Sequence, residues 1–442
     1  DVVRLCGEMT QSPTHKEIPM TQNQTVQISD SRRAEFNQIL NALEKEWRQN
    51  RSNKYDAINL KLCPSFAEVE KAAPEYCVDF LIHCIDLIRG WGRNKVFKNK
   101  GENSIHNYDT IRAAMAMALA RKRELHPQGV TTFIVDRNIN YTNACWVDCK
   151  FCAFYRDHKD EDAYVLGFDE IGQKIEELIA IGGTQILFQG GVHPKLKIEW
   201  YEDLVEFIAK KYPSITIHGF SAVEIDYIAR ISRISTREVL RRLREKGLYS
   251  MPGAGAEILS DRVRDVIAPK KCDVETWLRI HREAHEEGLK TTATMMFGTV
   301  ETTREIVEHW EHIRSLQDET GGFRAFILWS FQGLNTRLAA EHPEIKKQSS
   351  NRYLRLLAVS RLFLDNVPNI QSSWVTQGSY IGQLALLFGA NDLGSTMMEE
   401  NVVKAAGASY RMNQDEMIRL IKDIGEKPAK RNTNYDILER FY

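Results

Sequence analysis

The sequence predicts an α/β fold of the TIM type, a (β/α)8 barrel with a helical segment before it and a helical extension after it. Between residues 131 and 397, short β-rich runs alternate with amphipathic stretches, and the alternation occurs eight times. Such alternation implies parallel strands joined by crossover helices, and eight units suggest a closed barrel. A doubly wound open sheet and a partial six-stranded barrel are the alternatives.

The expected elements follow one another from the first strand to the last. The strands are expected at 131–135, 184–188, 215–220, 248–251, 291–297, 325–329, 371–375 and 394–397. The helices between them are expected at 169–181, 200–211, 236–246, 274–288, 302–316, 351–365 and 377–388. Each helix shows apolar residues at the three- and four-residue spacing of one helix face.

The chain is expected to divide into three parts. Residues 1–108 form an amino-terminal segment, disordered at first because it is polar and without periodicity, then helical at 31–50 and 76–89. The barrel covers 109–410 and begins with a helix at 109–125, and a helical extension covers 411–442.

Composition excludes several classes of partner. The 59 Lys and Arg balance 60 Asp and Glu, which gives a net charge of −1 and no reason to expect nucleic acid. No apolar run approaches the ~18 residues of a membrane span, so we expect a cytoplasmic protein that does not bind membranes. Eight cysteines among 442 residues are too few for a disulfide scaffold, so clustered cysteines need a metal or redox explanation.

Three cysteines cluster directly after the first expected strand. Cys145, Cys149 and Cys152 are separated by three and then two residues, so they converge only if the loop wraps around something. A structural zinc site prefers four ligands, and the one further candidate nearby is His158. A [4Fe–4S] cluster held by three thiolates keeps one iron open for another ligand. We therefore predict three cluster ligands, with inert thiols or zinc as the alternatives.

Polar and glycine-rich runs stand where the next strands end, and in a parallel barrel binding groups collect there. The paired glycines at 189–191 let a backbone approach a ligand closely. His218 and Glu224 follow the third strand, where Glu224 either caps a helix or accepts hydrogen bonds from hydroxyl groups. The glycine-rich run 252–257 is expected to be a flexible loop against a substrate.

A competing metal signal is the pair His281 and His285, which share one helix face and suggest a zinc hydrolase. In the metallopeptidase pattern a glutamate directly follows the first histidine, whereas here it is Glu283. The helix is also expected on the barrel exterior. A solvated or internally satisfied pair is therefore favoured over a zinc site.

The cysteine spacing, with Phe151 before the last cysteine, resembles that of the radical S-adenosylmethionine enzymes. The resemblance implies a [4Fe–4S] cluster on the three cysteines and S-adenosylmethionine on the open iron. It also implies that Phe151 lies near the adenine, that the glycines lie near the methionine amino group and that Glu224 lies near the ribose. The implied cofactor-binding residues are Phe151, Tyr155, Gln189, Gly190, Gly191 and Glu224.

Longer runs are similar to the futalosine branch of this family, which serves menaquinone biosynthesis. These runs are 135–143, 152–155, 189–194, 217–221, 291–298 and 389–400. The resemblance implies removal of the ribose C4′ hydrogen of dehypoxanthine futalosine and closure of the carbon radical onto the benzoate ring. An aminofutalosine synthase and a deazaflavin-chromophore synthase subunit are the alternatives within the family.

The implied reaction needs one electron to start, and it releases an electron and a proton when the benzoate ring becomes aromatic again. The candidate groups for accepting the proton are His218, Glu224 and Asp392, and the choice among them stays open. Aromatic walls for the benzoate are expected from Tyr155, Trp329 and Trp374. The implied protein partner is a one-electron reductant such as flavodoxin or ferredoxin.

Overall fold

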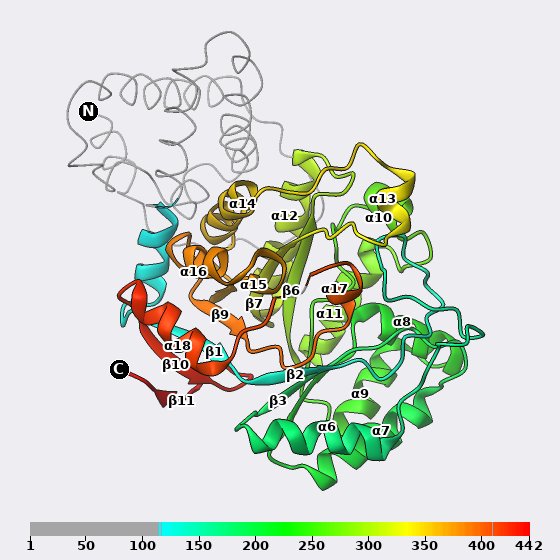
Figure 1. Ribbon diagram of the computed structural model, residues 1–442. Helices are drawn as coiled ribbons and strands as arrows, with labels where there is room; N and C mark the ends of the chain where they lie inside the picture. Colours follow the sequence, from blue (N-terminus) through cyan, green and yellow to red (C-terminus); the bar gives the residue numbers. More distant parts are fainter. Residues whose placement is uncertain (1–114, 116, 409) are drawn as a thin grey trace, which may run out of the picture. The chain divides into compact units, whose positions relative to one another are not determined.

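The computed structural model describes residues 115, 117–408 and 410–442 (Figure 1). The helices expected at 31–50 and 76–89, and residues 109–114 of the next one, lie outside the described residues. Residues 117–125 are helical, as predicted.

In the described part of the chain, one eleven-stranded sheet forms in the order β11-β10-β1-β9-β8-β7-β6-β5-β4-β3-β2. All eight expected strands are present, shifted by a few residues. They are β1 (Val130–Ile134), β3 (Gln185–Phe188), β4 (Thr216–Gly219), β5 (Ser250–Met251), β6 (Lys290–Phe297), β7 (Phe323–Ser330), β8 (Asn369–Gln371) and β9 (Asp392–Ser395). Each pairs in parallel with the next from β3 to β9, as crossover connections require.

The sheet curls and closes through its first strand. Strand β2 (Asp136–Ile139) continues β1 after the single residue Val135. The β1 half pairs with β9, whereas the β2 half pairs with β3. The backbone N–H groups of Thr396 and Met398 extend the contact with β9 by donating to the carbonyls of Ile134 and Asp136. The continuous run of β1 and β2 therefore pairs with β9 at one end of the parallel series and with β3 at the other. This closes the sheet and confirms the predicted barrel.

Helices surround the strands in Figure 1. The longer ones are α6 (Phe168–Ala180), α7 (Ile198–Lys211), α8 (Ala222–Ser232), α9 (Thr236–Lys246), α11 (Val274–Glu286), α12 (Thr303–Thr320), α14 (Ser350–Phe363) and α16 (Ser379–Leu387). Helix α6 shows why they pack: Ile171, Ile175 and Leu178 recur at helical spacing and are fully buried. The shorter helices are α10 (Asp261–Ile267), α13 (Arg337–Glu341), α15 (Trp374–Gln377) and α17 (Val402–Ala405).

The extension at 411–442 differs from the helical prediction. It forms α18 (Gln414–Asp423) and then two strands, β10 (Lys427–Arg431) and β11 (Ile437–Arg440). Strand β10 pairs in parallel with β1, and β11 pairs antiparallel with β10. The run Lys-Pro-Ala-Lys-Arg is too polar to suggest a strand, and it becomes one because Arg431 finds a buried acidic partner in the barrel.

None of the helices in the described ranges is both long and apolar enough to span a membrane.

Candidate functional site

The cysteine loop follows β2 and is tied into the protein by its backbone. The N–H of Cys145 donates to the carbonyl of Arg156 at 3.0 Å, and the N–H of Trp146 donates to that of Val192 at 2.7 Å. Asp148 has a φ of 53°, in the left-handed region, where the chain reverses between the first two cysteines. The loop thus turns back on itself around its thiols.

The three cysteines are free and partly exposed, and the thiols of Cys145 and Cys152 are near enough to affect the pKa of Cys149. Burial raises the pKa of all three, that of Cys152 to about 11, and the neighbouring thiols raise the pKa of Cys149 further. Hydrogen bonds from backbone groups, among them Val147 and Val192, oppose this rise at Cys145. Backbone donors aimed at a sulfur stabilise its thiolate, the form that binds metals.

This arrangement fits a [4Fe–4S] cluster. Among the described residues, no three His, Cys, Asp or Glu side chains form a group that suits a single metal ion. A cluster needs a wider arrangement, because each thiolate binds a different iron, and thiolates with hydrogen bonds to sulfur are its usual ligands.

Glu224 stands at the start of α8 and is 2% exposed. One carboxylate oxygen accepts hydrogen bonds from the Tyr141 hydroxyl at 2.6 Å and the Gly190 N–H at 3.2 Å. The other accepts from the N–H and the hydroxyl of Ser221, at 2.6 and 2.7 Å. A carboxylate offers about four acceptor positions, and these four bonds use them. Glu224 therefore holds the loop after β3 to the start of α8, and its contact with a ribose stays a prediction.

The paired glycines are required by the protein's own packing. A Cβ atom on Gly190 would lie 2.6 Å from the Tyr141 ring, and one on Gly191 would lie 2.3 Å from the carbonyl oxygen of Ala144. The run with Gln189 thus packs against the residue just before Cys145. This places it beside the cysteine loop, as the sequence predicts, while its contact with the methionine amino group stays a prediction.

The three candidate bases lie in different environments. The ring Nδ1 of His218 contacts the Ser250 hydroxyl at 2.7 Å, and burial lowers the pKa of His218 to about 3, so its imidazole is neutral. Asp392 is the first residue of β9 and fully buried. It pairs with Arg431 at 2.6 and 3.1 Å and accepts a bond from Thr132 at 2.5 Å. Asp392 therefore has its charge neutralised by Arg431 at the amino end of its strand, and its role as a proton acceptor stays a prediction.

Of the three aromatic residues expected to line the benzoate pocket, two are partly exposed and one is buried. Tyr155 and Trp329 are partly exposed, as a wall requires. Trp374 is only 1% exposed, and its indole N–H donates to the carbonyl of Ser395 at 3.0 Å. Trp374 is a core residue and does not line a pocket.

The run 252–257 is held firmly, contrary to the flexible loop expected. The N–H of Gly253 donates to the Thr292 hydroxyl at 3.0 Å, and Arg264 donates to the carbonyls of Gly255 and Ala256 at 2.9 and 3.0 Å. A Cβ on Gly253 would lie 2.5 Å from the Ala293 backbone, so the glycine serves close packing.

One charged pair at the cysteine loop was missed at the sequence level. The ammonium of Lys271 lies 4.8 Å from the centre of the Phe151 ring and forms a buried ion pair with Glu257. Its positive charge lowers the pKa of Cys149, against the larger effect of burial. Nothing in the spacing of these residues links Lys271 to cysteines more than a hundred positions earlier.

The histidine pair faces the sheet and contacts protein groups there, although the Nε2 atom of His281 is buried without a hydrogen-bond partner. His281 is fully buried, 3.9 Å from the Trp277 ring between ring centres. His285 contacts the hydroxyls of Thr320 and Thr291 at 2.6 and 2.8 Å. The pair is thus not solvated, although α11 covers the outside of the sheet, and it lacks a third metal-binding group among the described residues.

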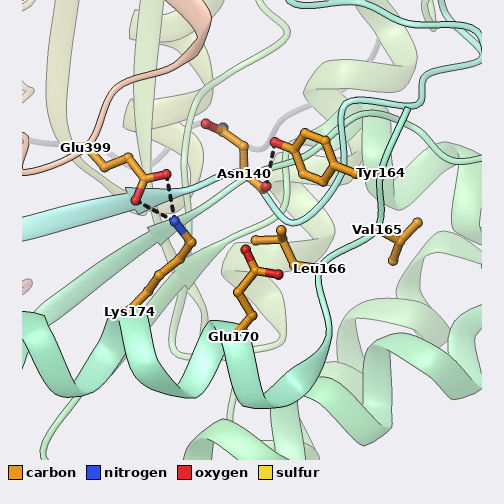
Figure 2. Close-up of a pocket in the computed structure, with 7 residues that line it drawn as sticks. All are labelled: Asn140, Tyr164, Val165, Leu166, Glu170, Lys174 and Glu399. Atoms are coloured by element: carbon orange, nitrogen blue, oxygen red, sulfur yellow. Dashed lines mark hydrogen bonds and ion pairs between the residues drawn. The ribbon is translucent and has the colours of Figure 1, made fainter. Parts of the chain in front are cut away.

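A cavity of about 350 Å³ lies beside the stretch that leads into the cysteine loop. Figure 2 shows Lys174 and Glu399 across one side of it, paired at 3.0 Å, and the Tyr164 hydroxyl bonded to the Asn140 carbonyl at 3.1 Å. Its other lining residues are Val165, Leu166 and Glu170. None of the predicted site residues lines it, so we do not place the reaction there.

Family models match most of the described chain. The radical SAM superfamily (SAM, S-adenosylmethionine) matches residues 139–313, which include the cysteine loop, and the CofH/MqnC C-terminal region matches 320–441. Two solved structures share the fold at 14% identity. Methylornithine synthase has a TM-score of 0.57 and covers 78% of this chain and 97% of its own. The FeFe-hydrogenase maturase HydG from Carboxydothermus hydrogenoformans has a TM-score of 0.59 and covers 84% and 83%. The fold and the three-thiol loop together define a radical SAM enzyme, which uses a [4Fe–4S] cluster and S-adenosylmethionine.

The relatives narrow the family further. The cyclic dehypoxanthine futalosine synthase of Halalkalibacterium halodurans is 44% identical, over 77% of this chain and 91% of the relative. That of Streptomyces coelicolor is 46% identical, over 74% and 81%. A Methanopyrus kandleri protein named 5-amino-6-(D-ribitylamino)uracil–L-tyrosine 4-hydroxyphenyl transferase is 39% identical, over 69% and 84%. The chain belongs to the radical SAM family that contains the cyclic dehypoxanthine futalosine synthases.

Proposed function

We propose that this enzyme converts dehypoxanthine futalosine into cyclic dehypoxanthine futalosine, a step of menaquinone biosynthesis. The observation that carries the choice is the 44% and 46% identity to two synthases of that name, over most of each relative. The archaeal transferases reach 37–40%. The cysteine loop by itself suits many radical reactions and does not choose among them.

We assign cluster binding to Cys145, Cys149 and Cys152. When bound and reduced, the cluster and S-adenosylmethionine supply a 5′-deoxyadenosyl radical able to remove the ribose C4′ hydrogen. The protein holds this loop rigid through its backbone bonds to Arg156 and Val192. A rigid loop fixes the reacting groups at contact range and limits side reactions with solvent.

The residues around the loop orient the other groups. We assign the run Gln189 to Gly191 to the methionine end of the cofactor, because it packs directly on the residue before Cys145. Phe151 and Tyr155, on the loop itself, are proposed to line the rest of the cofactor site. Of the three candidate proton acceptors, His218 has a neutral imidazole, and its described contacts include no ion pair.

The test is a product assay with the anaerobically reconstituted enzyme, dithionite and S-adenosylmethionine. We expect dehypoxanthine futalosine to be cyclised, and we expect no product from 5-amino-6-(D-ribitylamino)uracil with L-tyrosine. The reverse result would assign the chain to the reaction named for its archaeal relatives. Flavodoxin or ferredoxin, the proposed physiological reductants, should replace dithionite.

A further inference from the structure

A buried charge pair lies against the cysteine loop. Phe151 stands between two proposed cluster ligands, Cys149 and Cys152, and the ammonium of Lys271 lies 4.8 Å from the centre of its ring. The side chains of Lys271 and its partner Glu257 are 7% and 6% exposed. Charges removed from water in this way act strongly on their neighbours, because little solvent screens them.

The backbone fixes the acidic member of the pair. Glu257 has a φ of 43°, in the left-handed region that residues with a side chain rarely adopt. Its carbonyl accepts a bond from the N–H of Met296 at 2.9 Å, and the Ala256 carbonyl before it accepts one from Arg264 at 3.0 Å. Strain of this kind persists where the surrounding structure imposes it, often at functional sites.

The same arginine fixes the basic member. Arg264 is buried and donates to the carbonyl of Cys272 at 3.0 Å, directly after Lys271. The preceding Lys270 places its ammonium 5.0 Å from the centre of the Trp146 ring, on the same cysteine loop. The segment that carries Lys271 is thus held on both sides of that lysine, by the cysteine loop before it and by Arg264 after it.

The two charges oppose each other at the loop. The ammonium of Lys271 lies over the ring of Phe151, which stands between two proposed cluster ligands, and Glu257 is paired with that ammonium. Reduction of a [4Fe–4S] cluster adds one negative charge, and nearby charge is among the factors that set its potential. A cation beside the loop therefore favours the reduced cluster, and the anion paired with it weakens that effect.

We propose that Lys271 and Glu257 are positioning residues that set the reduction potential of the cluster, Lys271 raising it and Glu257 lowering it. This inference rests on the proposed function in one respect, namely that the loop holds a cluster. It gives the pair a role in the electron-transfer step, with no contact to the substrate.

The experiment is a potentiometric titration of the reconstituted protein without substrate, followed by the EPR signal of the reduced cluster. The variants are Lys271→Met, Glu257→Gln, the double variant and Lys271→Arg. We expect a lower midpoint potential for Lys271→Met and a higher one for Glu257→Gln. The double variant should fall between the two single variants and below the wild type, and Lys271→Arg should stay close to the wild type because it keeps the charge.

Opposite shifts distinguish an electrostatic role from a structural one. A pair that only stabilises the fold would lose cluster in both single variants or leave the potential unchanged in both, and either result overturns the inference. If one single variant fails to fold, the double variant and Lys271→Arg provide the test. Equal midpoint potentials in the double variant and the wild type would contradict a larger effect of Lys271 than of Glu257. Absence of any cluster signal in the wild type would overturn the proposed function as well.

Discussion

The two ends of the barrel differ in how their polar and charged groups are paired. At the amino end, buried charges meet each other: Asp392 pairs with Arg431, and Lys122 pairs with Glu426 at 2.6 Å. Arg361, fully buried, donates to the carbonyl of Gly389 at 2.8 Å. At the carboxyl end one buried pair, Lys271 with Glu257, lies beside the cysteine loop, hydrogen bonds mainly hold the loops in place, and the three thiols form no disulfide among the described cysteines.

This difference indicates that the amino end of the barrel serves stability and the carboxyl end serves the reaction. In barrels of parallel strands, reactions are built on the loops at the carboxyl ends, whereas the amino ends serve stability. Substitutions at the two ends should therefore change different measured quantities. The predictions below test that division.

The largest effect is expected at the cysteine loop. Replacing Cys149 by Ala removes one of three cluster ligands and should abolish the cluster signal and the cleavage of S-adenosylmethionine. We expect a loss of at least ~100-fold, since even outer residues of a metal site cost up to that much. Absorption and EPR spectra with a 5′-deoxyadenosine assay measure both.

Cys272 is the matched control, because it is a free thiol packed against the same apolar cluster as Cys145 and Cys149. Cys272→Ala should keep cluster and cleavage. An active, fully loaded Cys149→Ala protein would show that the ligands are assigned wrongly.

The second effect belongs to the amino end. Asp392→Asn leaves Arg431 as a buried charge without its counterion and should lower the free energy of unfolding by about 3–5 kcal/mol. Urea denaturation measures this, and the folded protein should load its cluster normally. A double variant, Asp392→Leu with Arg431→Met, should recover much of the stability. Loss of cluster from a folded Asp392→Asn protein would break the division between the ends.

The features that the sequence predicted depend on local patterns, whereas those it missed depend on contacts between distant segments. Strands depend on local pattern, and the eight strands were predicted correctly, whereas the assignment of Cys145 and Cys152 as cluster ligands stays a prediction. The pairs Asp392–Arg431 and Glu257–Lys271 join distant segments, and no local spacing marks them. Strand β10 was missed because its partners come from the far end of the chain. The domain limits at 108/109 and 410/411 stay a prediction.

A third, intermediate effect is expected at Glu224, which links the glycine run to α8. Glu224→Gln replaces an acceptor oxygen by a donor amide, which leaves one or more of its donors unsatisfied at about 1–3 kcal/mol. If the glycine run contacts the cofactor, the Kd of S-adenosylmethionine should rise by ~10-fold to ~100-fold, with the cluster retained. Tyr141→Phe removes one of these bonds and should show a smaller rise. An unchanged Kd in both variants would leave Glu224 with a structural role alone.

The smallest effect on activity is expected for His281→Gln with His285→Gln. Both side chains contact only protein groups, so cluster loading and cleavage should change by less than about threefold, since substitutions outside a site act mainly on stability. A severe loss of activity in a folded protein would instead support a zinc site on these two histidines.

The same variant has a signature in pH dependence. Burial lowers the pKa of His285 from 6.5 to about 4, and lowers that of His281 well below 6.5. A base with a lowered pKa stabilises the fold above its unfolded pKa, and this contribution is lost as the pH falls from 6.5 toward the folded value. At pH 5 the loss is about 2 kcal/mol for His285, and His281 adds to it in the same direction. The double variant should therefore lose less stability between pH 7 and pH 5 than the wild type.

The central claim is that this loop directs a radical to the ribose of dehypoxanthine futalosine, and isotope transfer tests it most directly. The substrate is labelled with deuterium at ribose C4′ and incubated with the reduced enzyme and S-adenosylmethionine, and the 5′-deoxyadenosine is analysed by mass spectrometry. We predict that one deuterium appears in 5′-deoxyadenosine as the cyclic product forms. Unlabelled 5′-deoxyadenosine, or transfer from another ribose position, would contradict the account.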